Sequence, residues 1–274
     1  MSWHASLRLH YRRDGAATRA FAEHHGPLRV LKALYPEDAA VCHHTVLHPP
    51  SGIVGGDVLD LSLILEANAH AVLTTPGASR FYRCEGVDAT QFVSATLAPE
   101  SRLEWLPQEN IAYSGTRMVN RQTFALAPGA EMMGWDMLAL GLPASHAPFA
   151  AGCVWQRLEI SGVWLEQARI DASDALLLNS PLGLAGHRAM ATLWWAAGSS
   201  LVPQRVAIAL EAARALLAQG GVVAGVTQVH PQVVVLRALA QQTEPVSQLL
   251  RAVRLVWRQT LWGAAAVEPR VWAT

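Results

Sequence analysis

Cysteine is scarce in this sequence of 274 residues, which contains only Cys42, Cys84 and Cys153. The number is odd, the three residues lie far apart, and none belongs to a Cys-x-x-Cys pair. These features argue against a disulfide framework and fit a reducing compartment. The sequence also lacks a typical secretory signal and any run of about 18 apolar residues. We therefore expect a soluble, cytoplasmic protein.

Charge is sparse and balanced. Charged residues make up 15% of the chain, and 21 basic residues stand against 21 acidic ones. Lys32 is the only lysine, and the arginines are scattered rather than clustered. Because nothing here attracts a polyanion, we expect neither a nucleic-acid partner nor a membrane.

The motifs of nucleotide-binding, hydrolytic and dedicated metal sites are missing. The glycine-rich residues 51–57 lack the GxGxxG spacing and a GK[ST] ending, and a strand-like run rather than a helix follows them. There is no GxSxG, SxxK or HExxH motif. His24-His25 and His43-His44 are adjacent pairs whose side chains point to opposite faces of a strand, so neither pair chelates a metal alone. A tight metal site is not expected, whereas transient binding stays open.

The sequence is rich in apolar residues, which make up 51% of the chain and form short runs up to about residue 200. Many runs alternate apolar and polar residues, as strands with one buried face do. Turn residues separate them at intervals of about 8–12 residues, which favours mainly antiparallel β structure over βαβ units. The predicted strands are residues 3–11, 28–34, 58–65, 70–74, 91–97, 102–106, 118–126, 154–160, 163–171 and 175–178.

The last quarter of the chain has helical periodicity. It predicts helices over residues 203–219 and 245–262, with a buried strand over 232–240 between them. Pro203 suits the first turn of the first helix, and Gly220-Gly221 suit its end. We find no internal repeat and no clear linker. We therefore expect one domain over residues 1–274, with a β-rich body over 1–200 and a helix–strand–helix unit over 203–262.

Two stretches stand out for their composition. HPPSGIVGGD, residues 48–57, reads as a turn built from prolines and glycines, but its last residue leaves three roles open. Asp57 can cap the turn, line a pore or bind a cation. WLPQENIAYSG, residues 105–115, places Gln108-Glu109-Asn110 at a turn, where burial without partners would be costly. These three side chains therefore face either solvent or a polar cavity.

These two stretches, together with TTPGASRFYR at residues 74–83, resemble the UreD family of urease accessory proteins, called UreH in some organisms. Residues 221–240 resemble the family's C-terminal segment more weakly. The resemblance implies a mainly β fold, a helical stack of strands with two helices near the C-terminus. It implies no catalysis. It implies a scaffold that binds UreF directly, UreG through UreF, and the urease apoprotein, with a second copy possible in the complex.

The resemblance further implies an internal polar passage that carries nickel(II) as a transferred ion, with no cofactor stably bound. Oxygen ligands suit such transit because strong chelation would trap the ion. The candidates are Asp57 and Asp136 first, which are also the candidates for transient metal contact, and Glu109 second. Thr75 and Ser79 match the second block and are further passage candidates.

Other residues of the blocks are expected to have structural or partner-binding roles. The alternatives for the second block are turn chemistry with a surface ion pair or a place in the passage or partner surface. Leu142 and His146 depart from the family pattern, and His230 is not carried over from it. The structural or partner candidates are His48, Gly52, Gly55, Gly56, Arg80, Tyr82, Arg83, Trp105 and Gln108.

Three arginines lie on one side of the last predicted helix. Arg251, Arg254 and Arg258 fall opposite its apolar stripe, which indicates either a solvated face or a contact with UreF.

A different function also fits part of the sequence. It is a metal-dependent hydrolase that uses Asp57, Asp136 and histidines in one pocket.

Overall fold

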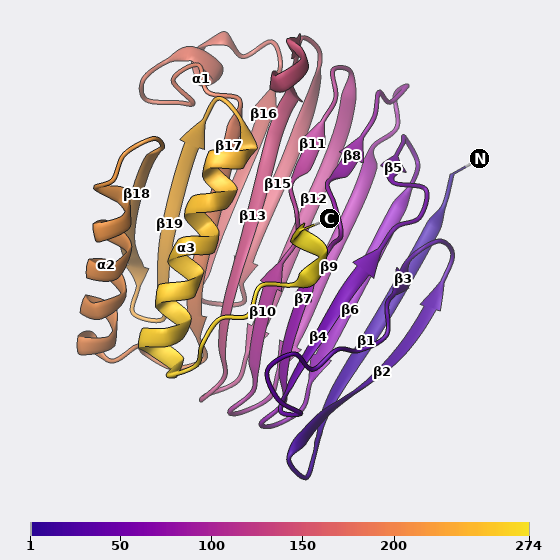
Figure 1. Cartoon of the computed structure of the whole chain (residues 1–274). Coiled ribbons are helices and arrows are strands. Elements are labelled where there is room, and N and C mark those ends of the chain that lie inside the picture. The colour runs from indigo at the N-terminus through magenta and orange to yellow at the C-terminus, as the bar shows by residue number, and fades with distance from the viewer. Residues whose placement is uncertain (1, 274) are drawn as a thin grey trace.

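The computed structural model describes residues 2–273 and consists of two facing β-sheets, with helices on the outer face of one of them (Figure 1). Sheet 1 has seven strands, in the order β16-β15-β12-β9-β6-β1-β2. Their bounds are β1 His4–Asp14, β2 Ala17–His25, β6 Val58–Leu65, β9 Ala89–Leu97, β12 Thr116–Leu126, β15 Gly152–Ile160 and β16 Trp164–Asp171.

Sheet 2 has twelve strands, and eight of them follow the order β18-β19-β17-β13-β10-β7-β4-β3. Their bounds are β3 Arg29–Val30, β4 Val41–Leu47, β7 His70–Thr74, β10 Arg102–Leu106, β13 Glu131–Leu142, β17 Ala189–Ala197, β18 Val223–His230 and β19 Val233–Ala240. The short strands are β5 Gly52–Ile53, β8 Ser79–Phe81, β11 Asn110–Ala112 and β14 Ala147–Pro148.

The helices are few and gather toward the end of the chain. They are α1 Ala175–Asn179, α2 Pro203–Leu217 and α3 Thr243–Trp262, with 3-10 turns η1 Pro143–Ser145 and η2 Arg270–Ala273. The predicted fold class, a mainly β helical stack with helices near the C-terminus, is confirmed. Within the described residues, no helix combines the length and apolar character needed to cross a membrane.

The prediction of mainly antiparallel pairing is wrong for the middle of both sheets. β1, β6, β9, β12 and β15 pair in parallel, and so do β4, β7, β10 and β13. Only the outer strands of each sheet pair antiparallel. The chain alternates between the sheets as it winds, so strands that neighbour each other in one sheet run the same way. Turn spacing cannot distinguish such a coil from a series of hairpins.

Several individual elements also differ from the prediction. Residues 175–178 form the short helix α1 rather than a strand, because the Asp174 side chain caps it by accepting the Leu177 N–H at 2.9 Å. β13 and β17 were not predicted, since they are buried on both faces and read as apolar runs without alternation. β2, β4 and β18 were also missed.

Two apolar cores lie on the two faces of sheet 2. One fills the space between the sheets, and the other lies between sheet 2 and helices α2 and α3. Alternate residues of β13 pack into the two cores. Met132 and Leu138 face sheet 1, whereas Met133, Trp135 and Met137 face the helices. Sheet 2 is therefore the middle layer of the molecule.

Helix α3 turns a charged face inward, which corrects both interpretations of its arginines. Arg254 and Arg258 are 1% and 0% exposed. The Nε of Arg254 donates to one oxygen of the fully buried Glu104 at 2.7 Å, and the Nε of Arg258 lies 3.1 Å from the other. Arg251 lies over the ring of Trp272, at 4.5 Å from its centroid. Neither a solvated face nor a direct partner contact fits Arg254 and Arg258.

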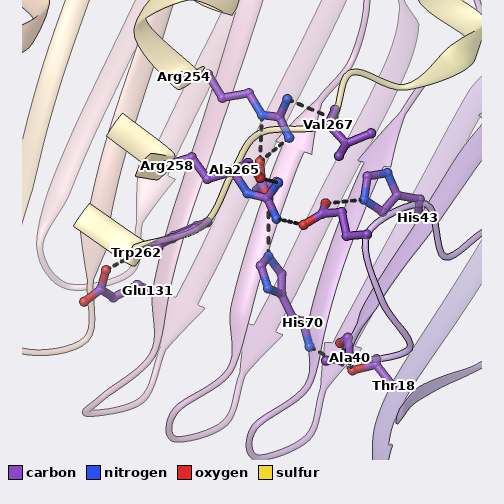
Figure 2. Close-up of polar contacts among 12 residues, drawn as sticks. Thr18, Ala40, His43, His70, Glu131, Arg254, Arg258, Trp262, Ala265 and Val267 are labelled. Atoms are coloured by element: carbon purple, nitrogen blue, oxygen red, sulfur yellow. Dashed lines mark hydrogen bonds and ion pairs between the residues drawn. The ribbon is translucent and has the colours of Figure 1, made fainter. Parts of the chain in front are cut away.

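The ionic cluster formed by Glu37, Glu104, Arg254, Arg258, His43 and His70 lies under the C-terminal segment (Figure 2). Glu37 joins Arg258 to His43, and His70 contacts Glu104 at 3.3 Å. After Gly263 the chain folds back, and the carbonyls of Ala265 and Val267 accept from the two guanidiniums. A helical wheel could not reveal these partners because the carboxylates lie about 150 residues or more away, as the Glu104–Arg254 bond shows.

Burial alone would raise the pKa of Glu104, but the Arg254 and Arg258 guanidiniums and the His70 bond hold it well below its usual range. We expect Glu104→Gln to lower the free energy of unfolding by about 3–5 kcal/mol at neutral pH, because two buried cations lose their partner. Denaturant unfolding measures this. Because the pKa is depressed in the folded state, the difference should shrink as pH falls below 4.5, the ordinary value.

The matched control for this prediction is Glu159→Gln, which removes the partner of Arg157 in a partly exposed pair on sheet 1. This variant should lower the free energy of unfolding by less than about 1 kcal/mol. Equal losses in the two variants would contradict a special role for the ionic cluster.

Candidate functional site

Asp136 lies on the face of β13 that looks toward sheet 1, and four amide side chains surround its carboxylate. One oxygen accepts from Asn110 at 3.3 Å, Asn120 at 3.2 Å and Gln122 at 2.9 Å. The other accepts from Gln156 at 2.7 Å. No guanidinium, ammonium or imidazole bonds to it among the described residues. The half-buried carboxylate is thus held by neutral dipoles alone.

The period of two along each strand explains why these side chains meet. Asn120 and Gln122 are alternate residues of β12, so both point into the space between the sheets. Gln156 is the register partner of Asn120 on β15 and points the same way. Asn110, on β11 of sheet 2, pairs with Leu138 of β13 and lies beside Asp136. Both sheets therefore contribute to one polar row.

The pKa of Asp136 is raised to about 7, mainly by burial and also by the charge of Glu166, although the hydrogen bonds from Asn120, Gln122 and Asn110 act in the opposite direction. The carboxyl group is therefore held between its neutral and charged forms near neutral pH. A cation that approached it would displace the proton and gain an oxygen ligand. Such a group suits temporary rather than tight binding.

A cavity of about 310 Å³ opens on one side of the polar row. Asn110 belongs to the polar row and also lines this cavity. Gln91 lines the cavity too and extends the row, because its amide donates to Asn120 at 3.4 Å. The Nε2 atom of His48 is buried and has no hydrogen-bond partner among the described residues. Burial also lowers the pKa of His48, although the charge of Asp57 opposes this, so the ring is neutral. The other polar side chains that line this cavity are Ser51, Thr75, Ser79 and Arg80.

A smaller cavity, about 40 Å³, lies on the other side of Asp136 and is lined by Gln156, Glu166 and Thr192 among others. Glu166 is a candidate that the sequence reasoning missed. It accepts from the Thr192 hydroxyl at 3.2 Å and forms an ion pair with Arg237. The alternation of residues 163–171 contained the signal, since Glu166 shares its strand face with the buried Ile170. The polar row thus runs from one cavity to the other through Asp136.

Asp57 has a different role from Asp136. It is 2% exposed, and its two oxygens accept the backbone N–H groups of Trp3 at 2.7 Å and Val54 at 3.0 Å. Asp57 lines neither cavity of the polar row. Of the three roles that the sequence left open, the structure shows the cap, which closes the glycine turn and anchors the start of the chain.

The remaining passage candidates, Thr75, Ser79 and Glu109, differ in whether they line a cavity. The Thr75 hydroxyl accepts from the Gln108 N–H at 2.9 Å and donates to Gly77 at 3.0 Å, while the residue lines the larger cavity with Ser79. Glu109 is half-buried and accepts from Thr243, at the start of α3, at 3.4 Å. Asn110, its neighbour, is the member of the Gln108-Glu109-Asn110 cluster that faces the polar cavity.

Several block residues have structural roles. A Cβ on Gly52 would lie 2.1 Å from the ring of Tyr82, which packs edge-on against Tyr113 at 4.8 Å. A Cβ on Gly55 would meet the Val87 carbonyl at 2.8 Å, and Gly56 has φ +89°. The Trp105 indole donates to Gln122 at 2.8 Å and so supports the polar row.

The other residues that the sequence singled out lie outside the polar row. Arg83 packs against Gly115, and Arg80 is exposed. Leu142 and His146 flank η1, where His146 has φ +54°. His230 accepts the Gln232 N–H in a turn.

The geometry does not assemble the pocket that a metal-dependent hydrolase requires. Within residues 2–273, no group of three or more histidine, cysteine, aspartate or glutamate side chains is placed to hold a metal ion. Asp57 bonds to backbone and Asp136 to amides, and no histidine is bonded to either in this part of the chain. The alternative prediction therefore gains no support.

Comparison with known proteins gives a consistent result. The family model described as UreD urease accessory protein matches residues 4–273. The chain is 50% identical over 275 residues to the protein named urease accessory protein UreD from Paracidovorax citrulli, and 52% identical over 279 residues to that from Leptothrix cholodnii. A third protein of this name, from Verminephrobacter eiseniae, is 52% identical over 275 residues. Each match covers the whole of both chains.

We expect Asp57→Ala to lower the free energy of unfolding by about 1–3 kcal/mol, because the backbone N–H groups of Trp3 and Val54 lose their acceptor. Asp57→Asn should recover part of the loss, since its carbonyl oxygen still accepts one bond. Thermal or denaturant unfolding of both variants tests this. An Asp57→Ala protein as stable as the parent chain would show that the cap contributes nothing.

Asp136→Asn should change the pH dependence of stability. The folded-state pKa is raised from 3.8 to about 7, so the folded chain binds the proton more tightly, and this contribution is lost as pH rises between those values. The parent chain should therefore lose up to about 4 kcal/mol relative to the variant between pH 4 and pH 8. Denaturant unfolding across this range measures it, and a constant difference would contradict the raised pKa.

Proposed function

The chain belongs to the UreD family of urease accessory proteins, and from that membership we propose that it is a non-catalytic scaffold that helps to deliver nickel(II) to apo-urease. In this proposal it binds UreF directly, UreG through UreF, and the urease apoprotein. Nickel is its cargo rather than a resident cofactor. Assembly takes place in the cytoplasm.

The observation that carries the nickel part of the proposal is the polar row between the sheets. It links a cavity of about 310 Å³ to one of about 40 Å³ through Asp136. An apolar interior would be the default between two packed sheets, and buried polar groups of this number need a reason to be there. A route for a partly hydrated cation would be such a reason.

The chemistry of the row suits transit. Carboxylate, amide and hydroxyl oxygens, with the single imidazole of His48, can each replace a water of a nickel ion without holding it as thiolate or clustered imidazole ligands would. Cys42 and Cys153 are buried, but neither lines the two cavities. The ion would meet Thr75, Ser79 and His48 first, Asp136 in the middle and Glu166 last.

The absence of a catalytic role is consistent with the same geometry. Among the described residues, only amide side chains are hydrogen-bonded to the Asp136 carboxylate, and no hydroxyl or thiol is paired with it as a nucleophile is paired with a base in acyl-transfer or hydrolytic catalysis. Its one carboxylate of raised pKa is surrounded by amides. The arrangement can accept and release a proton or a cation, and this matches the proposed delivery.

The test is urease activation with Asp136→Asn. We expect the variant to co-purify with UreF and urease as the parent chain does, while the nickel content and activity of the urease fall roughly tenfold, because the central ligand loses its charge. Nickel is measured by elemental analysis of the purified urease.

The matched control is Asp60→Asn, which removes a half-buried carboxylate from β6. Val93 and Leu61 point inward at neighbouring register positions, so Asp60 belongs to the outer face of sheet 1. It should leave nickel loading unchanged. Full activation by the Asp136→Asn chain, or an equal loss with Asp60→Asn, would remove the polar row from the mechanism.

A further inference from the structure

An ion pair between the two sheets closes the end of the polar row at Glu166. Glu166 is on β16, the edge strand of sheet 1, and Arg237 is on β19 of sheet 2. The Nε of Arg237 lies 3.0 Å from the carboxylate, and a second guanidinium nitrogen also contacts it. The side chains are 27% and 53% exposed, so the pair lies at the boundary between the interior and solvent.

The strand register makes Arg237 the outermost side chain of the row. Asp136 pairs with Thr192 of β17, Thr192 with Arg237, and Arg237 with Gly225 of the edge strand β18. A Cβ on Gly225 would meet nothing within 4 Å. No side chain therefore flanks Arg237 at this position of β18, and the guanidinium has room to move outward.

The two carboxyl groups beneath this ion pair favour a bound cation. Glu166 and Asp136 both line the cavity of about 40 Å³, together with Thr192. The charge of Glu166 contributes to the raised pKa of Asp136, which means that the two carboxyl groups interact. Arg237 supplies one positive charge from the solvent side. It is the cation that compensates Glu166 when the chain is alone.

We propose that Arg237 competes with the transferred cation for Glu166 and so gates the end of the polar row. When the ion pair opens, Glu166, Asp136 and the Thr192 hydroxyl form an oxygen-ligand site for a divalent cation. When it closes, the guanidinium displaces the ion. This inference rests on the proposed function, since it concerns the same passage, but it makes a separate prediction about binding.

The test is calorimetric titration of nickel chloride into the full chain in the absence of urease. We expect Arg237→Gln to bind nickel about tenfold more tightly than the parent chain, because a competing positive charge is removed from the carboxylate. Arg237→Lys, which keeps the charge, should return the affinity toward that of the parent. The double variant Glu166→Gln, Arg237→Gln should lose the gain.

The matched control is Arg169→Gln. Arg169 is on β16 as Glu166 is, pairs with Asp171 at 2.9 Å, and lies over Trp155. This variant should leave nickel affinity unchanged. The melting temperature of Arg237→Gln shows whether that variant folds. If it does not, Arg237→Met takes its place, because methionine keeps the aliphatic stem of the side chain without the charge, and we expect the same gain in nickel affinity.

An unchanged nickel affinity in folded Arg237→Gln or Arg237→Met, or an equal gain in Arg169→Gln, would overturn the gate. The outcome is separable from that of the proposed function. Reduced urease loading by Asp136→Asn with no effect of Arg237→Gln would leave the passage standing without the gate. Tighter binding by Arg237→Gln with full urease loading by Asp136→Asn would show a gated nickel site that is not the delivery route.

Discussion

The alternation of the chain between two facing sheets is the constraint on which the other features depend. Because each turn of the coil contributes one strand to each sheet, residues far apart in sequence share one interior. Asn110, Asn120, Asp136 and Gln156 come from four different strands, β11, β12, β13 and β15, and still meet at one carboxylate. The same winding makes neighbouring strands parallel, so an inward position on one strand is matched by an inward position on the next. A continuous polar row needs this regularity.

Sheet 2 separates two carboxylates with opposite electrostatics, the fully buried Glu104 and the half-buried Asp136. Glu104, on the face that meets α3, has two guanidinium partners and a pKa far below its usual range. Asp136, on the face that meets sheet 1, has only amide partners and a pKa raised to about 7. The first group is permanently charged and fixes the helix to the sheet. The second can exchange its proton, and the fold holds it in place without satisfying its charge. One face of the layer thus carries a permanent ionic cluster, and the other carries the carboxyl group for which a transfer role is proposed.

How much of this the sequence could predict depends on the range of the interactions. The fold class, both long helices and about half of the strands followed from local periodicity and from the family blocks. Asp136 was identified as a site residue, and the structure places it at the centre of the polar row. The buried positions of Arg254 and Arg258 could not be predicted, because their partner Glu104 is set by tertiary packing. Asp57 was ranked with Asp136, yet it accepts two backbone N–H groups, one from nearby Val54 and one from Trp3 at the start of the chain. Glu166 and Arg237 were missed because they meet only when β16 and β19 come together across the sheets.

The segment that follows Gly263 bears on how the protein is made. Its carbonyls at Ala265 and Val267 accept from Arg254 and Arg258, and η2 brings Trp272 against Trp135 and Thr74. These residues are synthesised after Glu37 and Glu104, which emerge from the ribosome much earlier. Until α3 has been made, Glu37 and Glu104 lack their guanidinium partners, and until α2 and α3 have both been made the outer face of sheet 2 lacks its cover. The β-coil can therefore wind during translation, but a nascent chain exposes the apolar outer face of sheet 2 to chaperones from the time β13 forms until α2 and α3 cover it.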